Sequence, residues 1–351
     1  MTTVRDGYDV VVVGGGAAGL GGALALARAR RSVLVVDAGE PRNAPAGHVH
    51  NYLGREGTPP GELLAAGRAE VASYGGEVVA GRVVSAEPVG GDTEADSTGF
   101  RVHLADGRRV SARRLLVATG LVDELPEVPG VAEQWGRGVL HCPYCHGWEV
   151  RDQQIGVLAT SPFSLHQAQL FRQWSARVTF FLHDQPAPAD EERERLAARG
   201  ITLVPGEVAE LVSVEDRVTG VRLVSGEVVA CQALVVAPRF TARADVLVSL
   251  GLESTELEVG GHVFGSAVAA DTTGATSVPG VWAAGNVTDL RGQVIGSAAA
   301  GLTAAAALNA DLIEEDTRRA VVEYRRGRAG FSADAERETS ERVLGDRRHG
   351  G

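Results

Sequence analysis

The stretch VVVVGGGAAG, residues 10–19, decides the fold of this chain. A run of β-branched residues meets a glycine turn, and an alanine-rich stretch over 22–30 follows it. In such a unit Gly14 allows the tight turn, Gly16 lets the backbone approach a pyrophosphate, and Gly19 permits close packing of helix on strand. The stretch therefore predicts a dinucleotide-binding βαβ unit. The alternative is a glycine-rich turn that holds no ligand.

Three later segments are predicted to surround the same ligand. The strand 32–36 ends at Asp37, where an acidic side chain accepts hydrogen bonds from an adenosine ribose. The apolar strand 114–117 ends in a turn of small residues, although such a turn identifies no ligand by itself. The alanine-rich helix expected over 293–313 would present the positive end of its dipole to an anion or an electron-rich ring.

A second informative stretch is HCPYCHGW, residues 141–148. Cysteines two positions apart, with a proline between them, bring their sulfurs within bonding distance at the first turn of a helix, where the dipole favours a thiolate. A zinc site needs four ligands, and His141 and His146 would crowd any one metal beside the two cysteines. The remaining cysteine, Cys231, is expected to be a small core residue. A redox pair is therefore favoured over zinc binding or mere packing.

Composition excludes several classes of partner. The chain has 351 residues and a formal net charge of -11, so a nucleic-acid partner is not expected, because phosphate binding needs a basic surface. No apolar run reaches the ~18 residues of a membrane span, and no signal-peptide core follows Met1. We expect a cytoplasmic protein without membrane contact. Three cysteines in this length favour a catalytic over a structural Cys-x-x-Cys.

A loop rich in proline and glycine over 41–61 follows the second strand and carries His48, His50 and Tyr52. Such a loop on a nucleotide-binding domain often lies over the cofactor or binds substrate. For each histidine taken alone, packing within the loop is the other interpretation.

A second βαβ unit is predicted from a strand at 155–159, a helix at 165–174 and a strand at 178–182. Its glycine turn is missing, because Ala159, Ser161 and Ser164 stand at the three glycine positions. Side chains there push the backbone away from a pyrophosphate, Pro162 lacks an N–H, and Asp184 would repel a ribose 2′-phosphate. The second site is predicted not to bind NADPH; the opposing view is that a degenerate turn still binds weakly.

On these motifs the chain resembles the low-molecular-weight thioredoxin reductases and their dithiol oxidase relatives, which are FAD-dependent pyridine nucleotide-disulfide oxidoreductases. The resemblance covers 8–313 and implies an α/β fold with two Rossmann-like domains and a homodimer. By this likeness 1–125 and 244–313 form a discontinuous FAD-binding domain, and 126–243 form an inserted NAD(P)H-like domain that carries the Cys-x-x-Cys. Residues 314–351 are expected to form a charged C-terminal tail, a solvated helix with a frayed end. The cofactor-binding positions that follow are Gly14, Gly16, Ala18, Gly19, Asp37, Ala118, Thr119, Gly120, Gly285, Asn286, Gln293 and Val294.

The resemblance also implies roles for the motif around the cysteines. Cys145 would lie against the flavin and form the charge-transfer thiolate, while Cys142 would exchange with the substrate disulfide. His146 stands where the reductases carry an acid, and a histidine that titrates near neutrality can move thiol protons; packing or capping is the alternative. His141 is a further candidate for the catalytic set. Asn286 replaces an aspartate of the reductases, and its amide still bonds a ribityl chain.

The missing nicotinamide site predicts the direction of electron flow. The gliotoxin- and holomycin-type dithiol oxidases, which the chain resembles, also carry Cys-x-x-Cys-His-Gly. They oxidise a small-molecule dithiol and pass the electrons to dioxygen. The leading hypothesis is therefore an FAD-dependent dithiol oxidase. The alternatives are a reductase of a thioredoxin-like disulfide, driven by NADPH or another donor, and a flavin redox sensor without turnover.

Overall fold

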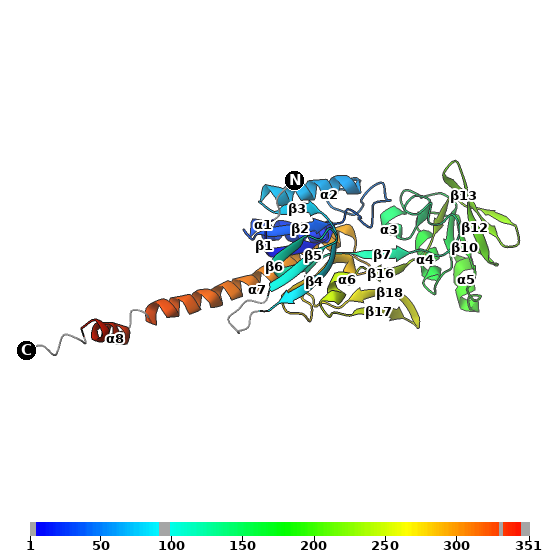
Figure 1. The fold of residues 1–351 in the computed structure, drawn as a ribbon. Helices are drawn as coiled ribbons and strands as arrows, with labels where there is room; N and C mark the ends of the chain where they lie inside the picture. Colours follow the sequence, from blue (N-terminus) through cyan, green and yellow to red (C-terminus); the bar gives the residue numbers. More distant parts are fainter. Residues whose placement is uncertain (1–4, 91–98, 330–332, 345–351) are drawn as a thin grey trace, which may run out of the picture.

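The computed structural model describes residues 5–90, 99–329 and 333–344. Two α/β bodies lie side by side, and a long C-terminal helix projects from the first of them (Figure 1). Each body is built on a sheet whose central strands run parallel. The predicted α/β class with two Rossmann-type sheets is confirmed.

The first body contains a seven-stranded sheet in the order β3-β2-β1-β6-β5-β4, with β19 also paired to β6. Strands β4 and β5 pair antiparallel, and the other pairings are parallel except that of β5 with β6. Val10, Val11 and Val12 are fully buried because helices and strands cover both faces of the sheet. The strands are β1 (Gly7–Val13), β2 (Val33–Asp37), β3 (Glu77–Ala80), β4 (Val83–Val89), β5 (Gly99–Leu104), β6 (Arg109–Val117) and β19 (Val281–Ala283).

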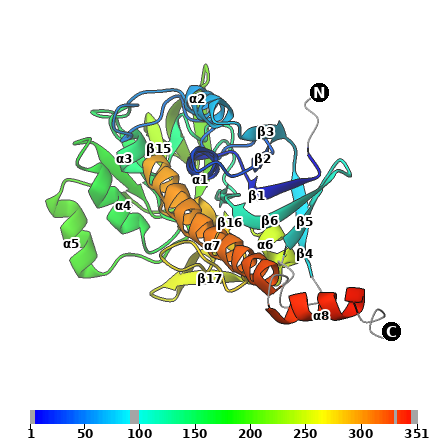
Figure 2. The ribbon, with the colours of Figure 1, turned by 90° about the vertical axis from the view of Figure 1, so that its left-hand side faces the viewer.

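Helices α1 (Ala17–Arg28), α2 (Pro60–Ser73) and α7 (Val294–Ala329) pack on one face of this sheet (Figure 2). Helices α1 and α7 approach closely because small residues line their contact. A Cβ at Gly301 would collide with the carbonyl oxygen of Ala18, and one at Gly21 would lie 2.6 Å from that of Ala298. The glycines therefore set the helix spacing.

The second body has a parallel five-stranded sheet in the order β11-β10-β9-β15-β8 and a separate antiparallel sheet β12-β13-β14. The helix expected over 165–174 is observed as α4 at Ser164–Phe171. The remaining elements are β8 (Val139–Leu140), α3 (Pro143–His146), β9 (Ile155–Leu158), β10 (Val178–Phe181), α5 (Asp190–Ala198), β11 (Thr202–Val204), β12 (Val208–Val214), β13 (Arg217–Leu223), β14 (Val228–Ala230) and β15 (Ala233–Val235).

Two antiparallel strands join the bodies. The chain leaves the first body through β7 (Leu121–Glu124) and returns through β16 (Arg239–Ala242), which pair with Leu121 opposite Ala242. They continue into a four-stranded sheet with β17 (Ser254–Val259) and β18 (His262–Val268), and α6 (Asp245–Ser249) follows β16. A 3₁₀ turn, η1 (Gly285–Val287), then leads to α7.

Helix α7 begins at Val294 and continues past 313 to Ala329, so the solvated helix expected from Glu314 is continuous with the alanine-rich helix. Ion pairs hold its middle to the sheet, because Arg113 on β6 bonds Asp9, Glu315 and Asp316 at 2.8, 2.8 and 2.6 Å. Burial alone would lower the pKa of Arg113, but these three carboxylates hold it above its ordinary value. The first turns of the predicted tail are thus anchored to the first body.

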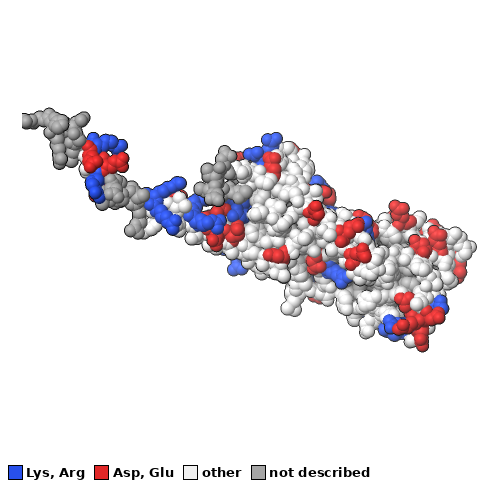
Figure 3. Space-filling view, turned by 90° about the horizontal axis from the view of Figure 1, so that it is seen from below, with Lys and Arg blue, Asp and Glu red and all other residues white. Residues whose placement is uncertain are grey.

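On the face in Figure 3, acidic side chains are spread over the body, and both charges occur along the projecting part of α7. The described residues form no continuous basic surface on that face. Among the described helices, none combines the length and apolarity that a bilayer crossing requires.

Arg113→Met is expected to lower the free energy of unfolding by about 2–3 kcal/mol, because it removes charge-assisted hydrogen bonds to three partly buried carboxylates. Urea denaturation of the FAD-loaded protein measures the change. Arg195→Met, on the exposed face of α5, removes an equally close but solvated pair and should change stability by less than about 1 kcal/mol. Equal losses in the two variants would contradict a stabilising role for the α7 ion pairs.

Candidate active site

The glycine turn between β1 and α1 forms one wall of a large cavity. Gly14 adopts a left-handed φ of 104°, and a Cβ there would lie 2.5 Å from the carbonyl oxygen of Ala118. A Cβ at Gly19 would collide with the Gly14 carbonyl, so this residue lets α1 sit directly on the turn. Gly16 has no atom within 4 Å of its Cβ position and faces open space. Backbone at Gly16 can therefore approach a pyrophosphate.

Asp37 lies at the end of β2 beside this turn. Its Oδ1 accepts the N–H groups of Gly15 and Gly39, both at 3.2 Å. Its Oδ2 is 3.9 Å from Arg68, so that oxygen has no close partner among the described residues. The carboxylate is thus oriented by the loop while one oxygen stays available for a ribose hydroxyl.

The cavity measures about 1400 Å³ and extends from the glycine turn to the cysteine pair. The first body supplies one side and the dithiol segment of the second body supplies the other. Gly19 lies beneath the turn rather than on the cavity wall. The predicted residues that line it are Gly14, Gly16, Ala18, Asp37, Ala118, Thr119, Gly120, His141, Cys142, Cys145, His146, Gly285, Asn286, Gln293 and Val294.

Both cysteines lie at the start of the short helix α3. Cys142 is the N-cap, Pro143 occupies the first helical position, and the N–H groups of Cys145 and His146 bond the Cys142 carbonyl at 3.2 and 3.1 Å. A hydrogen bond from the Cys145 thiol lowers the pKa of Cys142 to about 7, aided by the N–H groups of Cys145 and Tyr144 and opposed by burial. The same hydrogen bond, together with burial, raises the pKa of Cys145. The hydrogen bond between the two sulfurs therefore favours Cys142 as the thiolate of the reduced pair, whereas the resemblance implied a thiolate at Cys145.

The cysteine outside the pair has a different environment. Cys231 is 1% exposed, and burial raises its pKa to about 12. It is not among the residues that line the cavity. Among the described residues, no group of three or more His, Cys, Asp or Glu side chains is arranged to hold a metal ion.

Burial favours the uncharged form of both histidines that flank the cysteines. His141 Nδ1 lies 3.0 Å from the Val236 carbonyl and 3.1 Å from Gln167 Nε2. Because a carbonyl can only accept, a hydrogen bond to Val236 requires the tautomer with its proton on Nδ1, which leaves Nε2 as the acceptor. Burial lowers the pKa of His141, although the Val236 carbonyl opposes this. Burial also lowers the pKa of His146, whose Nε2 is buried with no hydrogen-bond partner among the described residues. Each ring can accept a thiol proton.

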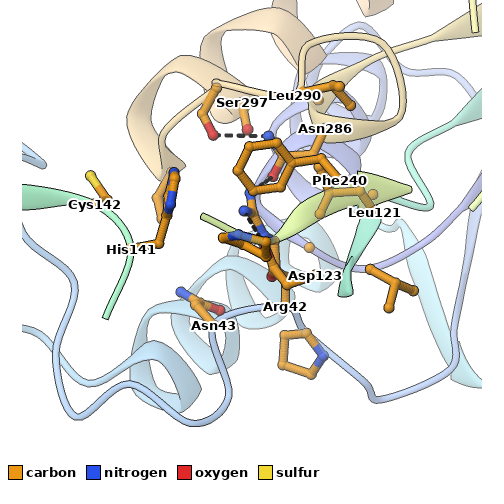
Figure 4. Close-up of a pocket in the computed structure, with 18 of the residues that line it drawn as sticks. Arg42, Asn43, Leu121, Asp123, His141, Cys142, Phe240, Asn286, Leu290 and Ser297 are labelled. Atoms are coloured by element: carbon orange, nitrogen blue, oxygen red, sulfur yellow. Dashed lines mark hydrogen bonds and ion pairs between the residues drawn. The ribbon is translucent and has the colours of Figure 1, made fainter. Parts of the chain in front are cut away.

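Arg42 and Asp123 form a cluster that the sequence did not reveal. The Arg42 guanidinium bonds both carboxylate oxygens of Asp123 at 2.8 and 2.7 Å and reaches Asn286 Oδ1 at 3.3 Å (Figure 4). The guanidinium also lies 5.1 Å from the centre of the Phe240 ring. His141 packs edge-on against the same ring, with 5.1 Å between the ring centres. After the hydrogen bonds within the dithiol segment, the Arg42 charge makes a small further contribution that lowers the pKa of Cys142. An arginine in a loop otherwise rich in proline and glycine was the available signal.

In the second body, the turn at the position of the missing glycine motif is closed by the side chain of Ser164. Ser164 Oγ accepts the N–H groups of Thr160 and Ser161 at 3.2 and 3.3 Å, in the place where a phosphate would accept them. Ser164 itself is fully buried. Phe163, next to it, packs against His262 of the first body. These contacts satisfy the turn without a ligand, and the loss of NADPH binding stays a prediction.

A cavity that joins a dinucleotide-binding turn to a cysteine pair, between two Rossmann-type folds, defines a flavin-dependent disulfide oxidoreductase. The cavity, the open space at Gly16 and the oriented Asp37 fit FAD. The chain belongs to the pyridine nucleotide-disulphide oxidoreductase family, whose profile matches residues 8–301. It is an FAD-binding enzyme that acts on sulfur groups, as the sequence resemblance predicted.

Similar proteins span most of the chain. The crystal structure of HlmI superposes with a TM-score of 0.84 at 47% identity and covers 93% of this chain and 98% of that one. Thioredoxin reductase sirT of Leptosphaeria maculans is 29% identical over 331 residues, 90% of this chain and 98% of that protein. Thioredoxin reductase tcpT of Claviceps purpurea is 33% identical over 188 residues, 52% of this chain and 58% of that protein.

Cys145→Ala is expected to raise the pKa of Cys142 above about 7, because alanine cannot donate the hydrogen bond that stabilises the thiolate. Cys145→Ser keeps a donor and should hold the pKa nearer to its original value. The test is the pH dependence of iodoacetamide modification at Cys142, followed by mass spectrometry on reduced protein; the rate rises with pH as the thiol ionises. Buried Cys231 serves as the unreactive internal control. Equal midpoints in the two variants would show that the hydrogen bond does not set this pKa.

Proposed function

We propose that this enzyme oxidises a small-molecule dithiol to a disulfide and passes the electrons through FAD to dioxygen. The observation that carries the proposal is the closed turn of the second fold, where Ser164 Oγ takes the backbone N–H groups that would bind a dinucleotide. A flavin that NADPH does not reduce must receive electrons from a thiol substrate. The proposal is supported by the 1400 Å³ cavity, which is lined by Cys142 and Cys145 as well as by the glycine turn.

The exchange step begins with the oxidised Cys142–Cys145 pair. One substrate thiolate attacks Cys142 Sγ, a substrate–Cys142 disulfide forms, and Cys145 leaves as a thiolate. The second substrate thiolate then attacks the substrate sulfur of the mixed disulfide, which forms the product disulfide and releases Cys142. Before this release the Cys145 thiolate takes up one of the substrate protons and donates its hydrogen bond to Cys142. The resulting low pKa of Cys142 favours the release, because a more acidic thiol is the better leaving group.

The overall reaction converts one dithiol and one dioxygen into one disulfide and one hydrogen peroxide. FAD, when bound, accepts two electrons from the reduced cysteine pair and hands them to dioxygen. The two substrate protons need acceptors inside the cavity. His141 Nε2 and His146 Nε2 are proposed to take them, since both rings are neutral at pH 7 and border the cysteines.

A thioredoxin-disulfide reductase is the second candidate, and the printed names of sirT and tcpT favour it. It differs in the direction of electron flow, and its donor is NADPH or another reductant. We further propose that the enzyme is a cytoplasmic homodimer and that it binds neither nucleic acid nor membranes. Gel filtration with light scattering tests the dimer directly.

Anaerobic mixing separates the two candidate functions. A small dithiol such as dithiothreitol should bleach the flavin absorption band rapidly, and NADPH should leave it unchanged, because Ser164 Oγ already accepts the N–H groups of Thr160 and Ser161 in the second turn. In air, the dithiol should support steady oxygen uptake with one peroxide per disulfide. Rapid bleaching by NADPH would rule out the oxidase assignment. Absence of turnover with every dithiol tried would favour the redox sensor.

His146→Asn is expected to reduce kcat for dithiol oxidation by on the order of 100-fold, the usual effect of removing a general base. His141→Asn tests the other ring in the same assay. In the wild type, activity should fall as the pH drops, because protonation removes the acceptor nitrogen; lowered pKa values place this loss on the acid side of the ordinary histidine range. His103→Asn, at a distant ion pair on β5, is the matched control. An unchanged rate in both variants would remove histidine from the proton transfer.

A further inference from the structure

We propose that Asn51, His50 and Phe163 are positioning residues that hold the dithiol helix α3 on the cavity side and keep the two bodies in one orientation during turnover. The inference rests on the proposed function, since an enzyme that does not use a nicotinamide site has no need to turn that site toward the flavin. The covalent link between the bodies is the two-strand ribbon of β7 and β16. Side-chain contacts outside this ribbon decide whether the bodies can turn.

Asn51 forms the first contact, from the loop between β2 and α2. Its Nδ2 donates a 2.7 Å hydrogen bond to the carbonyl of Tyr144, the residue immediately before Cys145. The backbone of Asn51 has a left-handed φ of 59°, a conformation that asparagine tolerates well. Its N–H bonds Glu56 Oε2 at 2.8 Å, which fixes this conformation. The loop thus presents one preorganised donor to the turn between the two cysteines.

His50 forms the second contact from the same loop. Its Nδ1 lies 2.5 Å from Glu56 Oε1, and its Nε2 lies 3.3 Å from Glu149 Oε1. Glu149 follows α3 in the second body, so the imidazole bridges one carboxylate from each body. Glu56 therefore orients both Asn51 and His50 toward the dithiol segment. Figure 1 shows this loop reaching α3 from the α2 side of the molecule.

Phe163 forms the third contact, and it comes from the turn that no longer fits a pyrophosphate. Its ring packs edge-on against His262 at 5.9 Å and against Phe264 at 6.1 Å, both on β18 of the first body. Arg291 in turn lies 5.4 Å from the Phe264 ring centre. In both ribbon views β17 and its partner β18 lie on the side of the molecule away from α2. The bodies are therefore held together from two sides of the ribbon.

These contacts keep the cysteines enclosed. Cys142 and Cys145 are only partly exposed, and both open into the cavity. A small dithiol reaches them through the cavity, whereas a bulky reagent requires the bodies to separate. The ratio of the two modification rates therefore reports the orientation of the bodies without any turnover.

The test compares modification of Cys142 in the reduced, FAD-loaded enzyme by iodoacetamide and by a maleimide attached to a large polyethylene glycol. Asn51→Gly removes the donor and tolerates the left-handed backbone, and Phe163→Ala removes the aromatic contact. The double variant should raise the ratio of the bulky to the small reagent rate by on the order of tenfold. Arg30→Gly is the matched control, since Arg30 is also left-handed (φ 65°) and is exposed on the first body. Its ratio should equal that of the wild type.

Single variants keep the test decisive if the double variant does not fold. Asn51→Asp retains the backbone preference but loses the donor, and Glu149→Ala removes the acceptor for His50; each should raise the ratio. Glu149→Gln keeps an acceptor oxygen and should restore a low ratio, while Glu133→Gln on the surface should have no effect. An unchanged ratio in folded Asn51→Asp and Glu149→Ala would overturn the proposal. That result leaves oxygen uptake intact, whereas failure of the proposed function abolishes dithiol-driven uptake and leaves the ratio as predicted.

Discussion

The close approach of backbone at the first glycine turn is the constraint on which the rest of the structure depends. Helix α1 packs directly on β1 because Gly19 has no side chain, and the Gly14 carbonyl occupies the space where a Cβ would lie. Helix α7 packs closely on α1 for the same reason, because Gly301 has no side chain and the Ala18 carbonyl occupies the space where one would lie. With these elements fixed, Asp37 and the turn at 118–120 meet around one open volume. A methyl group at either glycine would displace the cofactor site together with the core.

The second fold repeats the topology but satisfies its backbone differently. In both units a parallel strand leads into a helix through a turn whose N–H groups need acceptors. The first turn leaves open space at Gly16, while the second supplies its own acceptor, Ser164 Oγ. Stability of the second turn therefore requires no ligand. The neighbouring Phe163 is then free to serve as a contact between the bodies.

The sequence predicted those features that depend on local chemistry. The strand–glycine–helix pattern at 10–19, the acid at Asp37 and the spacing of Cys142 and Cys145 follow from constraints within a few residues, and the structure brings them to one cavity. The link between Arg42 and Asp123 could not be predicted, because it depends on how a loop folds over a strand 81 positions away. The same applies to Asn51 and Tyr144, which lie 93 positions apart and belong to different bodies.

The end of α7 shows a different limit of sequence patterns. Alanine and leucine give way to charged residues after 313, and such a run is typical of a solvated segment. Arg113 on the sheet, however, forms ion pairs with Glu315 and Asp316 as well as with Asp9, so these charges hold the helix to the sheet. Charge along a helix does not reveal which residues face solvent until the partner on the sheet is known. Within the cavity the local partner dominates, because the hydrogen bond from Cys145 favours a thiolate at Cys142, and Arg42, brought in from the loop, only adds to that preference.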